Sequence, residues 1–237
     1  MNRTVVIDCF HDSLPKYRKG YAIVAVDVIR STTVAVTGVA LGRKCFPVSS
    51  IEEAISLSKK LEFPILVGEL GGFMPFGFDL HNSPSDLEYR TDFSRPMILL
   101  STSGTRLICE FRDSEALYVA CLRNYRALIN HLSSHHPTVA LLGAGTRMEF
   151  REEDQLCCAW IAEGLMRKGY QPKNKKTSTL VDRWRKAPVD AIKDGKSAAY
   201  LRSSGQEKDL EFILTHVDDL DRIYRFKNGQ VVEDPIV

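Results

Sequence analysis

The sequence predicts an α/β fold: a three-layer α/β/α arrangement with a largely parallel or mixed central sheet. Several short apolar runs are nearly continuous, which is typical of strands covered by helices on both faces. These runs alternate with helical segments, which favours strands joined by crossover helices. Three of the runs lead into polar segments rich in hydroxyl groups, glycine or acids, and α/β proteins bind ligands at such strand ends.

Composition limits the function classes. The chain has 237 residues, of which 44% are hydrophobic and 26% charged, so it can bury an ordinary core. With 32 basic and 30 acidic residues, its net charge of +2 is too balanced to predict nucleic-acid binding. The sequence contains no apolar run long enough for a membrane span and no signal peptide, so we expect a cytoplasmic protein. The six cysteines lack metal-site spacing and are expected to be buried, reduced thiols.

The elements of the N-terminal part follow from periodicity and from cap and turn residues. Ser50 and Glu53 form a capping box that predicts a helix start, and Gly42 stops the helix before it. A core of residues 1–168 is expected to carry the site. Its expected elements are strands 4–7, 21–26, 44–48, 65–67, 96–100, 116–120 and 138–142, and helices 34–41, 51–61, 124–132 and 151–168.

Residues 169–237 are expected to form a helical and hairpin extension packed on the same core. The segment 171–176 is interpreted as a basic linker, and a basic helix is expected over 179–193. A further helix is expected around 210–214. The tail 223–232 reads as a β-hairpin, because Asn228-Gly229 is a typical two-residue turn between alternating strands.

The turn after strand 21–26 is the first candidate site. Asp27 ends the strand, and Arg30, Ser31 and Thr32 follow at the start of a helix. Hydroxyls cap helices, and the N–H groups and dipole of a helix N-terminus favour a phosphate. The alternative is that Ser31 or Thr32 is only a cap and that Asp27 pairs with Arg30 on the surface.

The longest irregular segment, 68–84, is the second candidate. It contains four glycines and two acids, Glu69 and Asp79, and it ends in Asn82 and Ser83. Backbone-permissive glycines beside acids suit a loop that wraps around a ligand. The alternative is an irregular loop in which glycine and proline only shape turns.

Two further segments complete the candidate site. The segment 101–106 is a hydroxyl-rich turn at a helix start, with Thr102, Gly104 and Thr105, and it is similar to a phosphate cradle without a Walker A lysine. Glu153 and Asp154 lie in the first turn of a helix. They either complement the helix dipole or supply a carboxylate to a metal, and the sequence leaves both open.

If the strands are parallel neighbours, these segments meet at one sheet edge. Carboxylates beside anion-binding hydroxyls suit Mg²⁺ and a phosphoryl group. The sequence therefore predicts a site suited to a metal ion and a phosphoryl group. It leaves open whether water or an aspartate attacks the phosphorus.

The ordered motifs resemble the 2-phosphosulfolactate phosphatase family. The motifs are Asp27–Thr32, Gly68-Glu69 with Gly77–Pro84, Ser101–Thr105, and Ala144-Gly145 with Glu153-Asp154. The resemblance implies an α/β enzyme that uses Mg²⁺ to hydrolyse 2-phospho-3-sulfolactate, a step toward coenzyme M.

The resemblance and the residue chemistry together give one set of expected roles. The catalytic candidates are Asp27, Arg30 and Asp79. The phosphate-binding candidates are Ser31, Thr32, Asn82, Ser83, Thr102, Gly104 and Thr105. The metal-binding candidates are Asp27, Glu69, Asp79, Glu153 and Asp154, with Mg²⁺ as the cofactor.

Two positions depart from the family pattern. His81 stands where the family usually has glycine, and Ser103 where it usually has asparagine. These departures motivate an alternative, a non-catalytic anion-binding or regulatory protein on the same fold; a different hydrolase acting on another small anion is a third option. The expected partner is a small anionic phosphorylated substrate, with no nucleic acid and no membrane, and a homodimer is one option for its assembly.

Overall fold

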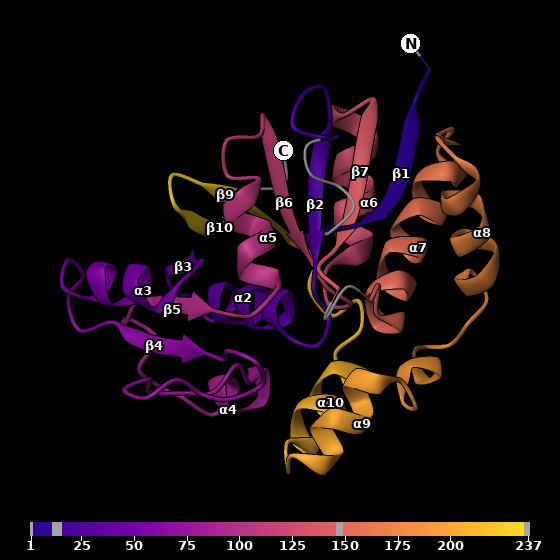
Figure 1. Ribbon diagram of the computed structural model, residues 1–237. Coiled ribbons are helices and arrows are strands. Elements are labelled where there is room, and N and C mark those ends of the chain that lie inside the picture. The colour runs from indigo at the N-terminus through magenta and orange to yellow at the C-terminus, as the bar shows by residue number, and fades with distance from the viewer. Residues whose placement is uncertain (1, 11–15, 146–148, 235–237) are drawn as a thin grey trace.

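The computed structural model describes residues 2–10, 16–145 and 149–234 (Figure 1). The strands are β1 (Thr4–Cys9), β2 (Ala22–Val26), β3 (Cys45–Val48), β4 (Ile65–Gly68), β5 (Met97–Leu100), β6 (Ala116–Ala120), β7 (Thr138–Gly143), β8 (Gln171–Pro172), β9 (Ile223–Lys227) and β10 (Gln230–Asp234). The α-helices are α2 (Ser31–Ala40), α3 (Ile51–Ser58), α4 (Pro84–Glu88), α5 (Gly104–Glu110), α6 (Tyr125–His135), α7 (Glu152–Arg167), α8 (Lys175–Trp184), α9 (Lys196–Ser203) and α10 (Glu207–Thr215), with a 3₁₀ helix at Val189–Ile192.

Within the described ranges, the strands form one mixed sheet in the order β4-β5-β3-β10-β9-β6-β2-β7-β1-β8. Strands β6, β2, β7, β1 and β8 pair in parallel, as do β3, β5 and β4. The hairpin β9–β10 joins these two groups by antiparallel pairing to β6 and to β3. The two parallel groups therefore have opposite polarity. The predicted mixed sheet is confirmed, but the position of the C-terminal hairpin inside it was not expected.

Each face of the sheet has its own helix layer. In β1, Val5 and Ile7 pack into one apolar cluster and Val6 into another, as alternation along a strand requires. The first cluster includes buried residues of α6, α7 and α8, and the second includes residues of α2 and α5. The predicted three-layer arrangement is confirmed.

Several helix boundaries differ from prediction. Helix α2 begins at Ser31, before the predicted start at 34, because Thr32 and Thr33 donate hydroxyl bonds to carbonyls of the preceding turn instead of capping the helix. Helix α8 begins at Lys175, where Asn174 accepts from the amide of Thr177 at 2.8 Å. The predicted helix over 179–193 is therefore wrong in both bounds, and part of the predicted linker is strand β8.

The C-terminal hairpin forms as its turn residues predict. Asn228 and Gly229 have φ values of 52° and 81°, the left-handed pair that a type I′ turn requires. This turn matches the twist of the two strands that it joins. The predicted boundary between a core of 1–168 and an extension stays a prediction, although β8, β9 and β10 all belong to the same sheet as the core strands.

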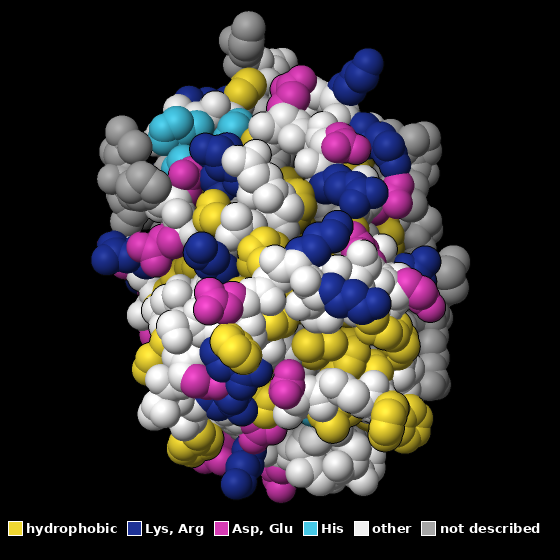
Figure 2. Space-filling view, turned by 90° about the vertical axis from the view of Figure 1, so that its left-hand side faces the viewer, with side chains coloured by type: hydrophobic (Ala, Val, Ile, Leu, Met, Phe, Trp, Pro, Cys, Tyr) yellow, Lys and Arg dark blue, Asp and Glu magenta, His cyan; other side chains and the backbone are white. Residues whose placement is uncertain are grey.

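The state of the cysteines and the charges on the surface match what the composition predicts. All six cysteines are buried, and the described residues contain no disulfide, which confirms the expected thiols. In the part of the chain that the structure describes, no helix combines the length and apolarity of a membrane span. Figure 2 shows basic and acidic side chains interspersed on one face, with hydrophobic side chains gathered in its lower half.

A group of histidines predicts how stability depends on pH. His131 Nε2 and His136 Nε2 each lie 2.8 Å from the hydroxyl of Tyr118. Burial, followed by the neighbouring histidines, lowers the pKa of His136 from 6.5 to about 4, and burial lowers that of His131. As the pH falls below 6.5, His131 and His136 become protonated in the unfolded chain but stay neutral in the folded chain. The free energy of unfolding therefore decreases toward pH 4.

Urea unfolding between pH 7.5 and 4.5 measures this dependence. His136→Gln is expected to reduce the loss of unfolding free energy at acid pH, because it removes one group that is protonated only in the unfolded chain. His135→Gln is the matched control, since this side chain is exposed, and its decline should remain close to that of the wild type. An equal acid decline in the wild type and His136→Gln would contradict the assignment.

Candidate active site

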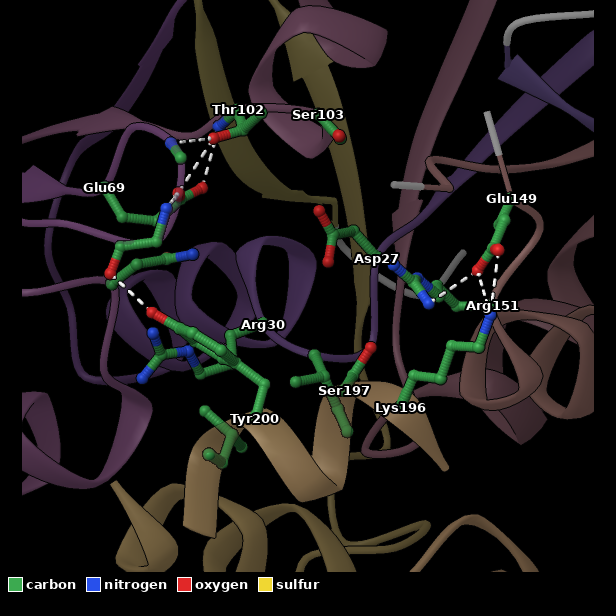
Figure 3. Close-up of a pocket in the computed structure, with 15 residues that line it drawn as sticks. Asp27, Arg30, Glu69, Thr102, Ser103, Glu149, Arg151, Lys196, Ser197 and Tyr200 are labelled. Atoms are coloured by element: carbon green, nitrogen blue, oxygen red, sulfur yellow. Dashed lines mark hydrogen bonds and ion pairs between the residues drawn. The ribbon is translucent and has the colours of Figure 1, made fainter. Parts of the chain in front are cut away.

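A cavity of about 420 Å³ lies where β2, β4 and β5 end (Figure 3). Asp27 follows β2, Glu69 follows β4, and Thr102 lies just beyond β5. These three residues, all predicted from sequence, line the cavity together with Arg30 and Asn82. The structure therefore brings the predicted strand-end motifs to one place.

The strand ends meet although β2 is not a neighbour of β4 or β5. In Figure 1, β4 and β5 run across the view toward the lower ends of β2 and β7. A bond of 3.0 Å from Ser101 Oγ to Ser31 Oγ joins the two turns directly. Sheet twist accumulates from strand to strand, and it allows groups of opposite polarity to converge at their carboxyl ends. The expectation of parallel neighbours was wrong, but the convergence that it implied is present.

Asp27 is the central acid of the cavity. It is buried, and Oδ1 accepts a bond of 3.3 Å from the amide of Ser31. Burial raises the pKa of Asp27 to about 7, and the charges of Glu69 and Glu153 contribute in the same direction. Groups with strongly shifted pKa values cluster at functional sites, so Asp27 is the leading candidate for direct contact with a ligand or metal.

Gly104 packs directly against Asp27. A Cβ atom at this position would lie 2.3 Å from Asp27 Oδ2 and 2.6 Å from Ser31 Cβ. No side chain larger than hydrogen fits without moving the carboxylate. Gly104 was predicted to contact phosphate, but it does not line the cavity. Its role is to let its own backbone approach the Asp27 carboxylate closely.

Gly104→Ala is expected to reduce kcat/KM by about 10²-fold, because a displacement near 1 Å at a reacting group has that effect. Steady-state kinetics on folded protein measure the loss. Gly164→Ala is the matched control, since its Cβ would meet Ile129 Cδ1 at 2.4 Å, away from the cavity. Equal kinetic losses in the two variants would show that the effect is only on folding.

Glu69 joins two loops. Its carboxylate accepts from the amide and the hydroxyl of Thr102 and from the amide of Gly72, each at 2.8 Å. Three of the four lone-pair directions of the carboxylate are therefore in use. Glu69 holds the cavity wall, and this geometry does not support its predicted role as a metal ligand.

Asp79 lies outside the cavity. It is exposed, and its Oδ2 accepts at 2.8 Å from the amide of Leu66 inside β4. Asp79 is not among the residues that line the cavity with Asp27 and Glu69. The predicted catalytic and metal-binding roles of Asp79 are therefore corrected: it satisfies a backbone group of the edge strand β4.

Arg30 is fixed by a buried network. Its guanidinium pairs with Asp209 of α10, and both side chains are less than 5% exposed. Arg30 Nη2 also lies 3.0 Å from His81 Nδ1, and His81 Nε2 lies 3.2 Å from the carbonyl of Gly72. Burial and then the charge of Arg30 lower the pKa of His81, so a neutral ring accepts from Arg30 and donates to Gly72. His81 thus connects the loop 68–84 to Arg30 in this chain.

Asp209 also fixes the end of that loop. Its Oδ1 accepts from Ser83 Oγ at 2.6 Å and from Ser85 Oγ at 2.7 Å. Ser83 caps α4 by accepting from the amide of Asp86. Ser83 therefore organises the loop and does not reach the cavity as a phosphate ligand.

The remaining hydroxyls predicted to bind phosphate stabilise the turns. Thr32 Oγ1 exchanges bonds of 2.8 and 2.9 Å with the backbone of Asp27. Thr105 and Ser101 bond each other, and Ser31 accepts from Ser101. None of these hydroxyls lines the cavity. Their geometry supports a role in positioning Asp27, not the predicted phosphate contact.

Glu153 and Asp154 lie close to Asp27 and are buried, with 2% and 3% of their surface exposed. Asp154 accepts from the amides of Val28 at 2.8 Å and Gly145 at 3.4 Å. Burial raises the pKa of Asp154 well above its usual value, and the charges of Asp27 and Glu153 add to the effect. Asp154 therefore holds two backbone amides, which is neither of the two predicted roles, and the charge of Glu153 acts on Asp27.

The C-terminal helices supply residues that sequence reasoning missed. Ser197, Tyr200 and Lys196 of α9 line one wall of the cavity, and Tyr200 donates to the carbonyl of Gly72 at 2.7 Å (Figure 3). Asp209 reads in sequence as an ordinary first-turn acid of a helix. No local signal distinguishes it, because its partner Arg30 lies 179 residues away.

The cavity offers few protein ligands for Mg²⁺. The described residues contain no group of three His, Cys, Asp or Glu side chains arranged to hold a metal. Magnesium is commonly bound by one or two protein groups, with water and substrate phosphate completing its shell. Asp27 supplies such a carboxylate, and the buried Asn82 Oδ1, which has no hydrogen-bond partner among these residues, supplies a second oxygen at the cavity. The site therefore fits a sparsely ligated ion and not a cage of five acids.

The fold and the cavity define an α/β protein with a polar, acid-bearing site beyond the carboxyl ends of its strands, where such sheets bind small ligands. The chain belongs to the 2-phosphosulpholactate phosphatase family, whose sequence model matches residues 9–229. The resemblance noted from four motifs is thereby confirmed.

Relatives of the chain carry the same family name. A protein of Clostridium perfringens strain SM101 named probable 2-phosphosulfolactate phosphatase is 31% identical over 228 residues, which cover 90% of this chain and 89% of the relative. Proteins with that name from Carboxydothermus hydrogenoformans and Pseudothermotoga lettingae are 38% and 40% identical over 146 and 147 residues. These matches cover 61% of this chain, and 60% and 62% of the relatives.

Proposed function

We propose that this protein is a magnesium-dependent phosphatase that hydrolyses the phosphate monoester of a small anionic 2-hydroxy acid similar to 2-phosphosulfolactate. Family membership supports the reaction class, since the relatives are named for this activity. The proposal includes that this hydrolysis is a step toward coenzyme M.

The observation that carries the proposal is the pairing of one buried acid with cations around one cavity. Asp27 faces a space also lined by Arg30, Arg151 and Lys196. A volume of about 420 Å³ suits a small molecule. An acid able to bind a cation, beside the Arg30 guanidinium, is what a phosphate ester with its metal requires.

The chain's own groups have separate tasks. Asp27 and Asn82 Oδ1 would hold Mg²⁺, which when bound supplies charge neutralisation at the phosphoryl oxygens. Arg30 donates to the transferring group, and its orientation is fixed by Asp209 and His81. The Ser103 side chain points into the cavity, toward Asp27, and offers a hydroxyl where the family usually has an amide (Figure 3).

Phosphate release from phosphorylated 2-hydroxy acids, with and without Mg²⁺, tests the proposal. The full chain is first dialysed against EDTA. We expect release only after Mg²⁺ is restored, and the fastest release from an ester that carries a second anionic group. Full turnover in EDTA would contradict the role of magnesium.

The non-catalytic alternative has a distinct signature. Thermal stabilisation by phosphate or sulfonate ligands, with no release from any ester in the presence of Mg²⁺, would favour an anion-binding protein. Release from esters without any acidic group would instead favour a different hydrolase.

A further inference from the structure

Two cations form one wall of the cavity, away from the loop 68–84. Figure 3 shows Arg151 and Lys196 together on one side, with Asp27 between them and the Glu69–Thr102 pair. Arg151 precedes the first residue of α7, and Lys196 is the first residue of α9. Two elements far apart in sequence thus place positive charge at one end of the cavity, across Asp27 from Glu69.

Both cations bind one carboxylate of the chain itself. Lys196 Nζ lies 2.8 Å from both carboxylate oxygens of Glu149, and Arg151 Nη1 lies 2.9 Å from Oε2. Two positive charges share this one carboxylate, and the charge of Arg151 also acts on the buried Glu153. Arg151 Nε is buried and has no hydrogen-bond partner among the residues that the structure describes. This wall therefore has more donor capacity than Glu149 uses.

The Glu149 contacts are also the kind that a ligand can replace. The Glu149 side chain is 49% exposed and that of Lys196 is 73% exposed, whereas that of Arg151 is 14% exposed, so the Lys196 contact is the more easily replaced. Exposed ion pairs contribute about 0–1 kcal/mol, because water competes for both charges. A substrate anion held elsewhere in the cavity would compete for these cations as an intramolecular partner, with a high effective concentration.

The distribution of charge around the cavity indicates what such a ligand carries. Arg30 and Asp27 lie at the part of the cavity assigned to the phosphoryl group, and Arg30 is already paired with Asp209. The donors at Arg151 and Lys196 have no task in holding that group. A planar guanidinium and an ammonium together suit a carboxylate or a sulfonate.

We propose that Arg151 and Lys196 form a second anion subsite that binds the carboxylate or sulfonate of a phosphorylated small acid, displacing the Glu149 carboxylate. This inference rests on the proposed phosphatase function, and it assigns the source of selectivity for acidic substrates to these residues. Glu149 then acts as a built-in competitor that the substrate anion replaces.

Two matched esters test the subsite. 2-Phospholactate and isopropyl phosphate differ only in the carboxylate. For Lys196→Met we expect kcat/KM to fall by about tenfold or more with 2-phospholactate, and by less than about threefold with isopropyl phosphate, as for a lost charge-assisted hydrogen bond. Lys193→Met is the matched control, because this lysine pairs with Asp190 outside the cavity, and it should change neither value.

Glu149→Gln is expected to improve substrate binding, the opposite of the effect expected for Lys196→Met. Removing the competing carboxylate should lower KM for 2-phospholactate several-fold and leave KM for isopropyl phosphate nearly unchanged. A damaged fold would not produce tighter binding. Equal losses on both esters in Lys196→Met, or an unchanged KM in Glu149→Gln, would overturn the subsite.

Calorimetric titration separates this inference from the proposed function. If the wild type released no phosphate from either ester, the phosphatase proposal would fail, but Kd values for the two esters would still test the subsite. The wild type should bind 2-phospholactate more tightly than isopropyl phosphate, and Lys196→Met should abolish that difference. Equal Kd values in the wild type would refute the subsite whatever the activity.

Discussion

Asp27→Asn is expected to lower kcat/KM by at least about 10³-fold and, at the same time, to raise the melting temperature. Asn loses the charge that would hold Mg²⁺, and several kcal/mol of transition-state stabilisation depend on it. The Asn side chain still accepts from the amide of Ser31, so the local geometry survives.

The gain in stability follows from the pKa of Asp27. Burial raises that pKa from 3.8 to about 7, so at pH 8 the folded chain carries a charge that it disfavours. The unfolded chain ionises the same group at no such cost, and the folded protein is therefore less stable at pH 8 than it would be with a neutral side chain. Each kcal/mol recovered raises the melting temperature by roughly 2–4 °C for a chain of this size.

Thermal unfolding in EDTA at pH 8, together with phosphate-release kinetics, measures both effects. Asp79→Asn is the matched control, because Asp79 is exposed and lies outside the cavity. Its activity should remain close to that of the wild type. A larger loss in Asp79→Asn than in Asp27→Asn would reverse the assignment of the two acids.

Asp209→Ala is expected to destabilise the protein by about 3–5 kcal/mol, because it leaves the Arg30 guanidinium buried without its partner. The variant also removes the acceptor of Ser83 and Ser85. We expect kcat to fall by about 10²-fold, since Arg30 and the loop end both lose their fixed positions.

A second variant separates stability from positioning. Arg30→Met combined with Asp209→Asn removes both charges and keeps an acceptor oxygen for the two serines. This double variant should unfold at a higher urea concentration than Asp209→Ala, while its activity stays low. Asp190→Ala is the surface control, because its pair with Lys193 is exposed and should change stability by less than about 1 kcal/mol. Wild-type activity in the double variant would exclude a catalytic role for the Arg30 guanidinium, and with it the role of Asp209 in positioning Arg30.

Individual residues show where prediction from the sequence succeeded. The motifs at Asp27, Glu69 and Thr102 were placed correctly at one cavity, because each follows a strand whose apolar run is visible locally. Asp79 was placed wrongly, since a carboxylate in a glycine-rich loop has the same signature whether it faces a cavity or satisfies a strand amide. Ser31 and Thr32 were predicted as ligands, but their hydroxyls hold the turn that carries Asp27.

The sequence by itself determined the fold class, the strand positions, the Asn228-Gly229 turn and the family, because these depend on local periodicity, on turn chemistry and on ordered motifs. Only the tertiary structure decided that the C-terminal hairpin joins two parallel groups of opposite polarity, that α9 lines the cavity, and that Asp209 of α10 holds Arg30 beside it. The physical reason is that strand neighbours and buried partners such as Arg30 and Asp209 are selected by packing between distant segments, and this selection leaves no mark on the sequence next to either residue.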